Sequence, residues 1–197
     1  MSIVTNVTAN FNADSVLKCG GKTINYEMDV DAAVNEAVCP DCGEHLRYRQ
    51  IVPRIIRTPN HERDGWCMVP KAQCPHCGRH ITLLPHDLIP FKHYCSDTIG
   101  GVIDGSIDDL TPETAEAPSP ETMRRWRRWF RKNLEYINGM LRLIRQKQTD
   151  EEQPADAGRK QLHAIIDECR QHQDPYWLVR VLIPIYAYGG CLTPVLN

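Results

Sequence analysis

The chain of 197 residues has no long hydrophobic segment. Its longest apolar stretch, Trp177–Ala187, is interrupted by Arg180 and Pro184, and a membrane-spanning helix needs about 20 apolar residues. The N-terminus carries no apolar signal, and aromatic residues make up only 7% of the chain. The sequence therefore predicts a soluble, cytoplasmic protein without membrane contact, with material for one modest core or a few small modules.

Common enzyme motifs are also missing. We find no glycine-rich phosphate loop, no Gly-x-Ser-x-Gly turn and no cysteine and histidine pair in a catalytic context. Six acidic residues gather in residues 104–121, but prolines interrupt this segment, and a metal-dependent nuclease needs a strand scaffold for such a cluster. We expect a protein that is not an enzyme.

Four of the nine cysteines form two matched CxxCG knuckles, Cys39-Pro-Asp-Cys42-Gly and Cys74-Pro-His-Cys77-Gly. Two residues between paired cysteines let both sulfurs reach one tetrahedral ion, and the glycine permits the positive φ of a knuckle. A closed shell of four thiolates leaves no position for a substrate, so such an ion is structural. The sequence predicts a zinc ribbon that binds one structural Zn2+ through Cys39, Cys42, Cys74 and Cys77.

Other interpretations of the cysteines and histidines were weighed against this one. A thiol oxidoreductase would carry one CxxC motif beside a βαβ pattern. Six of the eight histidines lie near the knuckles and could join Cys67 and Cys95 in a second metal site, but no pair has convincing ligand spacing. We interpret them as ordinary histidines, and His76 as a weaker ligand than the cysteines beside it.

The chain divides into four segments. Residues 1–38 have no readable role, although residues 3–8 resemble a strand and residues 13–17 a small helix. Residues 39–95 form the zinc ribbon, in which strands at 46–57 and from residue 66 onward flank a turn at 59–65. Residues 96–148 hold a short helix, an acidic connector and a long basic helix, and residues 158–197 form two more helices, the second beginning at Asp174 and Pro175. The fold class is α+β: a zinc-ribbon β-hairpin module, a helix-turn-helix-like region and C-terminal helices.

The basic helix stands out although the net charge of the chain is only −2. Residues 124–147 contain nine basic residues and one acid, Glu135. Ser119 followed by Pro120 is a typical helix start, and apolar residues then recur at three- and four-residue steps over residues 123–144. Asn138 and Gly139 offer a place for the helix to kink or end. Arginine and lysine residues occupy the face opposite the apolar stripe and the margins of that face.

Clustered guanidinium groups repel one another unless a polyanion neutralises them, and phosphates are the natural partner. The charge pattern of the basic helix therefore predicts that the protein binds DNA, most simply duplex DNA. Two other interpretations stay open: the basic face is simply solvated, or the acidic connector folds over it as an internal mask. The expected DNA-binding residues are Arg124, Arg125, Arg127, Arg128, Arg131 and Lys132.

Three stretches carry a family resemblance: the first knuckle, residues 73–94 (QCPHCGRHITLLPHDLIPFKHY) and residues 119–130 (SPETMRRWRRWF). They resemble a family of small, uncharacterised bacterial proteins associated with transposons, which are similar to the N-terminal DNA-binding parts of transposases. The resemblance covers about residues 35–132 and implies zinc on the four knuckle cysteines. It also implies that residues 122–130, similar to the start of a helix-turn-helix recognition helix, present arginines to DNA. Those proteins carry several basic residues where this chain has residues 66–73, so a DNA contact from the ribbon itself is not implied.

Together these features predict a zinc-dependent DNA-binding protein, a transposon-associated accessory factor or regulator rather than the recombinase, for whose catalytic domain the chain has no room. Residues 158–197 are expected to supply a helical surface for docking a transposase or another protein, or for forming a homodimer. The alternative is a protein-interaction adaptor, whose ribbon and Trp- and Arg-rich helix dock on a transposase, polymerase or nuclease subunit.

Overall fold

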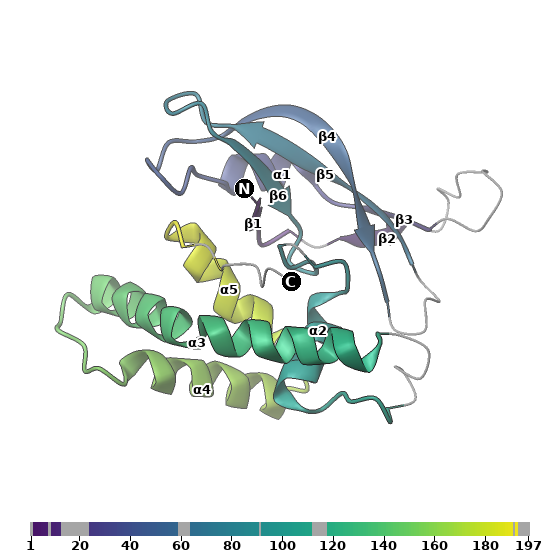
Figure 1. Ribbon diagram of the computed structural model, residues 1–197. Coiled ribbons are helices and arrows are strands. Elements are labelled where there is room, and N and C mark those ends of the chain that lie inside the picture. The colour runs from purple at the N-terminus through teal and green to yellow at the C-terminus, as the bar shows by residue number, and fades with distance from the viewer. Residues whose placement is uncertain are drawn as a thin grey trace.

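The computed structural model describes residues 2–7, 9–12, 24–58, 64–90, 92–111, 118–190 and 192. The described residues form a sheet from the N-terminal half and a group of helices from the C-terminal half, which confirms the α+β class (Figure 1). The elements are β1 Ser2–Val4, β2 Asn10–Asn12, β3 Ile24–Glu27, α1 Val30–Glu36, β4 Arg47–Ile56, β5 Gly65–Gln73, β6 His80–Leu84, α2 Ser96–Asp104, α3 Pro120–Thr149, α4 Ala157–Gln171 and α5 Trp177–Ala187.

The predicted hairpin between the knuckles is present as β4 and β5. The two strands pair antiparallel from Arg47 opposite Gln73 to Ile56 opposite Gly65, with an irregularity near Tyr48. Valine, isoleucine and aromatic residues favour such strands because they pack well on a pleated surface. Most of the predicted turn at 59–65 lies outside the described residues.

Four shorter strands extend the hairpin into a six-stranded sheet. β3 pairs in parallel with the start of β5, and β6 pairs antiparallel with its end. β1 is added in parallel to β6, and β2 antiparallel to β3. β1 shares only residues 3 and 4 with the strand-like stretch predicted at residues 3–8, whereas β2, β3 and α1 were not predicted. The predicted small helix at 13–17 lies outside the described residues.

The larger helices lie along one side of the sheet, as Figure 1 shows, with α5 between the strands and the antiparallel pair α3 and α4. α5 is apolar on nearly every side, and its residues from Trp177 to Val179 are buried, as expected of a helix enclosed by other elements. Buried residues of the sheet, such as Val69 and Leu83, and of α2, α3 and α5 belong to one hydrophobic cluster. Within the described part of the chain, no helix combines the length and the apolar character that crossing a membrane requires.

α3 begins as predicted, because Ser119 is its N-cap and the Ser119 side chain accepts a hydrogen bond from the Thr122 N–H. The helix does not end at Asn138 and Gly139 but continues to Thr149. Packing explains the difference, since Ile137, Leu141 and Ile144 on both sides of this point are buried in the core. Tertiary contacts thus override a local tendency to end the helix.

The connection to α3 is the long segment that the sequence predicts, although it is unlike a helix-turn-helix motif, and the start of α5 differs from the prediction. α2 packs against α3, but residues 105–119 join them, whereas a helix-turn-helix motif has a turn of about 3–4 residues. α5 begins at Trp177 with Tyr176 as its N-cap, so the predicted start at Asp174 is wrong. Asp174 instead accepts a hydrogen bond from the Tyr176 N–H at 2.9 Å, in the turn before the helix.

Candidate metal centre and basic surface

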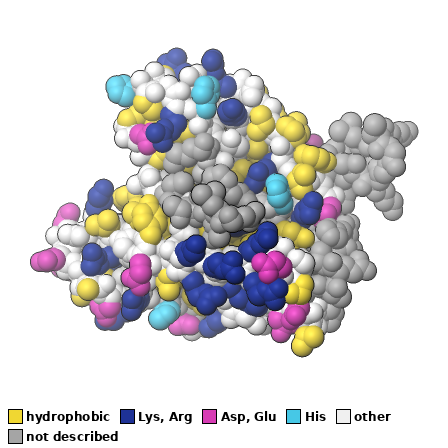
Figure 2. All heavy atoms as spheres, in the orientation of Figure 1, with side chains coloured by type: hydrophobic (Ala, Val, Ile, Leu, Met, Phe, Trp, Pro, Cys, Tyr) yellow, Lys and Arg dark blue, Asp and Glu magenta, His cyan; other side chains and the backbone are white. Residues whose placement is uncertain are grey.

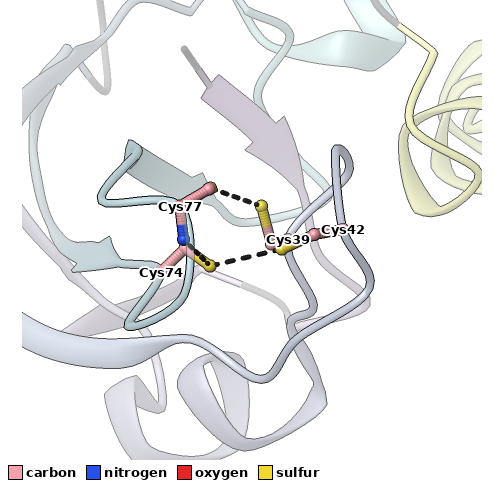
Figure 3. A group of neighbouring side chains, drawn as sticks. All are labelled: Cys39, Cys42, Cys74 and Cys77. Atoms are coloured by element: carbon pink, nitrogen blue, oxygen red, sulfur yellow. Dashed lines mark hydrogen bonds between the residues drawn. The ribbon is translucent and has the colours of Figure 1, made fainter.

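The four predicted metal ligands meet at one end of the hairpin. The first knuckle precedes β4 and the second follows β5, and the antiparallel pairing brings both to the same end. All four Sγ atoms lie within 4.8 Å of one another. The sulfurs of Cys39 and Cys77 are 3.5 Å apart, as are those of Cys42 and Cys74, and Figure 3 shows the side chains of the two knuckles facing each other. This cluster could hold one metal ion.

Both knuckles have the same backbone geometry. In each, the first cysteine donates its N–H to the carbonyl five residues later, at 2.8 Å for Cys39 and 2.9 Å for Cys74. The glycine N–H closes the turn onto the carbonyl of that cysteine, at 2.7 and 3.0 Å. Gly43 and Gly78 have φ angles of 74° and 73°, a region that favours glycine. The glycines therefore have the conformation that the sequence predicts.

The sulfurs differ in their affinity for protons. Cys74 accepts a hydrogen bond from the Cys77 N–H at 3.4 Å, and this bond lowers the pKa of the Cys74 thiol to about 7. A backbone hydrogen bond from Glu44 lowers the pKa of Cys42, but desolvation and the neighbouring thiols together raise it to about 12. A metal ion must displace protons from the sulfurs, and the lowered pKa of Cys74 favours that step at its sulfur.

An ion pair joins the two knuckles beside the sulfurs. Arg79 of the second knuckle contacts Asp41 of the first through Nε and Oδ2, and both side chains are largely exposed. Exposed ion pairs contribute little to stability, about 0–1 kcal/mol. The pair orients the knuckles rather than holding them together.

The remaining cysteines that the structure describes are not arranged as metal ligands. In the described ranges, the knuckle cluster is the one group of cysteine, histidine and carboxylate side chains close enough to share an ion. Burial raises the pKa of Cys67 to about 12 and also raises the pKa of Cys95. Cys169 is also buried, where a free cysteine behaves as a small apolar residue. Cys19 and Cys191 lie outside the described residues.

The predicted DNA-binding residues lie at the start of α3, and most of them share one exposed face. Figure 2 shows lysine and arginine side chains crowded over this part of the molecule. The apolar stripe behind them is buried, including Met123, Trp126 and Phe130. The term basic face is used below for the five exposed residues Arg124, Arg125, Arg128, Arg131 and Lys132.

Glu121 is the acid that contacts this face. It pairs with Arg124 at 2.9 Å and with Arg125 at 3.4 Å, and the hydrogen bond from Arg124 lowers its pKa. Within the described ranges, Arg128 and Lys132 have no carboxylate partner. The internal mask was predicted for the acidic connector at residues 104–121, of which residues 112–117 lie outside the described part of the chain.

Arg127 differs from its neighbours because its guanidinium is already engaged within the protein. It is half-buried, and its Nε donates to the Val102 carbonyl at 2.9 Å and its Nη2 to the Ile107 carbonyl at 3.5 Å. These bonds tie the end of α2 to α3. The sequence predicted a DNA contact for Arg127 and did not indicate this structural role.

Three further cations and a histidine lie in two segments near α3 and were not predicted as binding residues. Arg54 lies near the end of β4 and Arg57 follows that strand, while Lys92 and His93 lie in the segment between β6 and α2. The alternating pattern of β4 gives no sign that its arginines approach α3. The Lys-His-Tyr end of residues 73–94 was the one signal that could have directed attention to this place.

One family model matches residues 39–126, and its description is a domain of unknown function (DUF6431). No curated protein and no solved structure matches the chain. The matched range includes both knuckles, the hairpin, α2 and the start of α3. The similarity to this family therefore links the cysteine cluster to the first part of the basic helix.

Proposed function

We propose that the protein is a zinc-dependent DNA-binding protein that holds duplex DNA on the basic face of α3. The observation that carries this proposal is the exposure of five cationic side chains on one helix face, with Glu121 as their ion-pair partner among the described residues. Arginine can donate two parallel hydrogen bonds to a phosphate or to a guanine edge. A polyanion would also relieve the repulsion between these neighbours.

Zinc is the metal that best suits the cysteine cluster. In a tetrahedral site with Zn–S distances of about 2.3 Å, the sulfurs lie about 3.8 Å apart. The 3.5 Å separations and the 4.8 Å limit among the four sulfurs bracket that value. Four thiolates fill the coordination shell, so the ion would hold the two knuckles together and take no part in chemistry.

The ribbon would brace the DNA-binding helix through packing. The ring of Tyr94, in the segment after β6, meets the ring of Trp126 edge-on with centroids 5.1 Å apart. Edge-to-face aromatic pairs stabilise a contact by about 0.5–1.5 kcal/mol beyond the area they bury. The sheet that the metal closes thereby fixes the start of α3.

A role as a transposon-associated accessory factor or regulator is supported by the family resemblance of the sequence. The docking or dimerisation surface expected in residues 158–197 would lie on α4 rather than α5. α5 is mostly buried, whereas Arg159, Lys160 and His163 on α4 are exposed.

A second candidate function, the protein-interaction adaptor, is favoured by an apolar patch on the outer face of the hairpin. Trp66, Met68 and Ile51 are 39%, 44% and 42% exposed, and Trp66 and Met68 alternate with buried residues of β5. Figure 2 shows hydrophobic side chains gathered on this side of the sheet. Exposed apolar patches often mark protein contacts.

The two functions are separated by changing Arg124 and Arg128 to alanine together. For DNA binding, we expect the double variant to lose most of its affinity for duplex DNA in a fluorescence anisotropy titration, with an unchanged metal content. The matched control changes the exposed residues Arg47 and Arg49 of β4 to alanine and removes the same charge. Equal DNA affinity of the Arg124/Arg128 variant and the control would favour the adaptor.

A further inference from the structure

The three additional cations and His93 come from two segments that are bound to each other. Arg54 donates from Nη2 to the Lys92 carbonyl at 2.9 Å. The Arg57 N–H donates to the His93 carbonyl at 2.7 Å. These bonds hold the end of β4 and the segment after β6 side by side.

This cation cluster, defined as Arg54, Arg57, Lys92 and His93, continues the basic face of α3. The Lys92 Nζ lies over the ring of Trp129, 4.9 Å from its centroid. On α3, Arg125 and Lys132 are four residues before and three residues after Trp129, the spacing of neighbours on a helix surface. Lys92 therefore borders the same aromatic ring as two cations of the basic face.

The cluster is costly without an anion. Arg54 is half-buried, and its Nε is buried without a hydrogen-bond partner. Burial lowers the pKa of Arg54 and of Lys92. Desolvation lowers the pKa of His93, and the charges of Arg54 and Arg57 lower it further. Among the described residues, no carboxylate forms an ion pair with Arg54, Arg57 or Lys92, and burying unpaired charge is unfavourable.

We propose that Arg54, Arg57, Lys92 and His93 bind a phosphate group that is part of the backbone of the DNA lying on α3. The proposal rests on the proposed function for the source of the phosphate. Guanidinium, ammonium and imidazole N–H groups all donate to phosphate oxygens. Phosphate contacts fix the orientation of a protein on a duplex. A second anchor from the sheet would set the angle at which α3 meets the DNA.

The test compares Lys92→Gln and Arg57→Gln with the matched controls Arg47→Gln and Arg49→Gln, which change exposed residues at the start of β4. Binding of a mixed-sequence duplex is measured by fluorescence anisotropy at several salt concentrations from about 50 to 200 mM. We expect each cluster variant to lose about five- to tenfold in affinity at low salt and the salt slope to fall by about 1. The controls should change affinity less than about twofold, and circular dichroism melting and metal content report whether each variant is folded.

Binding of inorganic tripolyphosphate, measured by calorimetry, forms the second arm. Equal affinity of the wild type and of the Lys92→Gln and Arg57→Gln variants for duplex DNA would overturn the inference and leave the proposed function standing. Tripolyphosphate binding that needs Lys92, without any duplex binding, would overturn the proposed function and the DNA source, and would assign the cluster to a free phosphate compound. Binding of neither anion would overturn both.

Discussion

At the scale of single residues, the close packing of α3 and α4 depends on Gly158. A Cβ atom at this position would lie 1.8 Å from the Asn138 carbonyl oxygen. Such a contact is impossible without moving one helix away from the other. The contact between α4 and α3, the helix that carries the basic face, therefore requires that residue 158 has no side chain.

We predict that Gly158→Ala destabilises the protein by about 1–3 kcal/mol, because it forces the two helices apart. The control is Gly139→Ala on α3, where an added Cβ meets no atom within 4 Å. That change should leave stability equal or raise it by up to about 1 kcal/mol, since alanine is the better helix former. Urea denaturation measures both. Equal stability of the two variants would contradict the packing described here.

Arg127 and Arg128 make a second pair of neighbours with different roles. Arg127→Gln should cost about 1–3 kcal/mol, because two backbone carbonyls lose a charged donor. Arg128→Gln should change stability by less than about 0.5 kcal/mol but weaken duplex binding. Thermal melting and anisotropy titrations of both variants check this. A stable Arg127→Gln protein with reduced DNA affinity would show that Arg127 contacts DNA instead.

At the scale of elements, the two knuckles close the open end of the β4–β5 hairpin. A metal at the four sulfurs would hold residues 39–42 against residues 74–77. The exposed Arg79–Asp41 ion pair lies beside this contact. Structural zinc sites supply a large share of the folding free energy in small domains. The hairpin end is thus the part of the sheet most sensitive to loss of the metal.

We predict one zinc ion per chain, measured by elemental analysis of the protein as purified. The double variant Cys39→Ser/Cys77→Ser should contain none, and chelation of the wild type should lower its melting temperature. Cys67→Ala, which changes a buried cysteine outside the cluster, should keep its zinc. Zinc retained after both serine changes would place the ion elsewhere.

Long, regular elements were predictable from the sequence. β4 and α3 each keep one residue pattern over ten or more residues. The start of α3 is also marked by a local signal, Ser119 followed by Pro120. β2 and β3 have three and four residues, too few for a periodic pattern, and their partners are distant in the chain. The start of α5 was misplaced because Asp174 bonds the N–H of Tyr176 in a turn instead of capping the helix.

At the scale of the whole molecule, the basic surface is assembled from parts distant in sequence. The cysteine ligands were predictable because each knuckle is a local motif with its own backbone bonds. Arg54 and Lys92 are 38 residues apart, yet they are joined by one hydrogen bond, and Lys92 reaches α3 through Trp129. Only the sheet and its packing on α3 bring these residues together, so no periodicity in the sequence could indicate them.

The measurement that tests the central claim most directly is the salt dependence of duplex DNA binding by the wild-type protein. If about six phosphates are neutralised, the logarithm of the binding constant should fall linearly with the logarithm of salt concentration, with a slope of about −5. Absence of binding at low salt, or binding with no dependence on salt, would contradict the account.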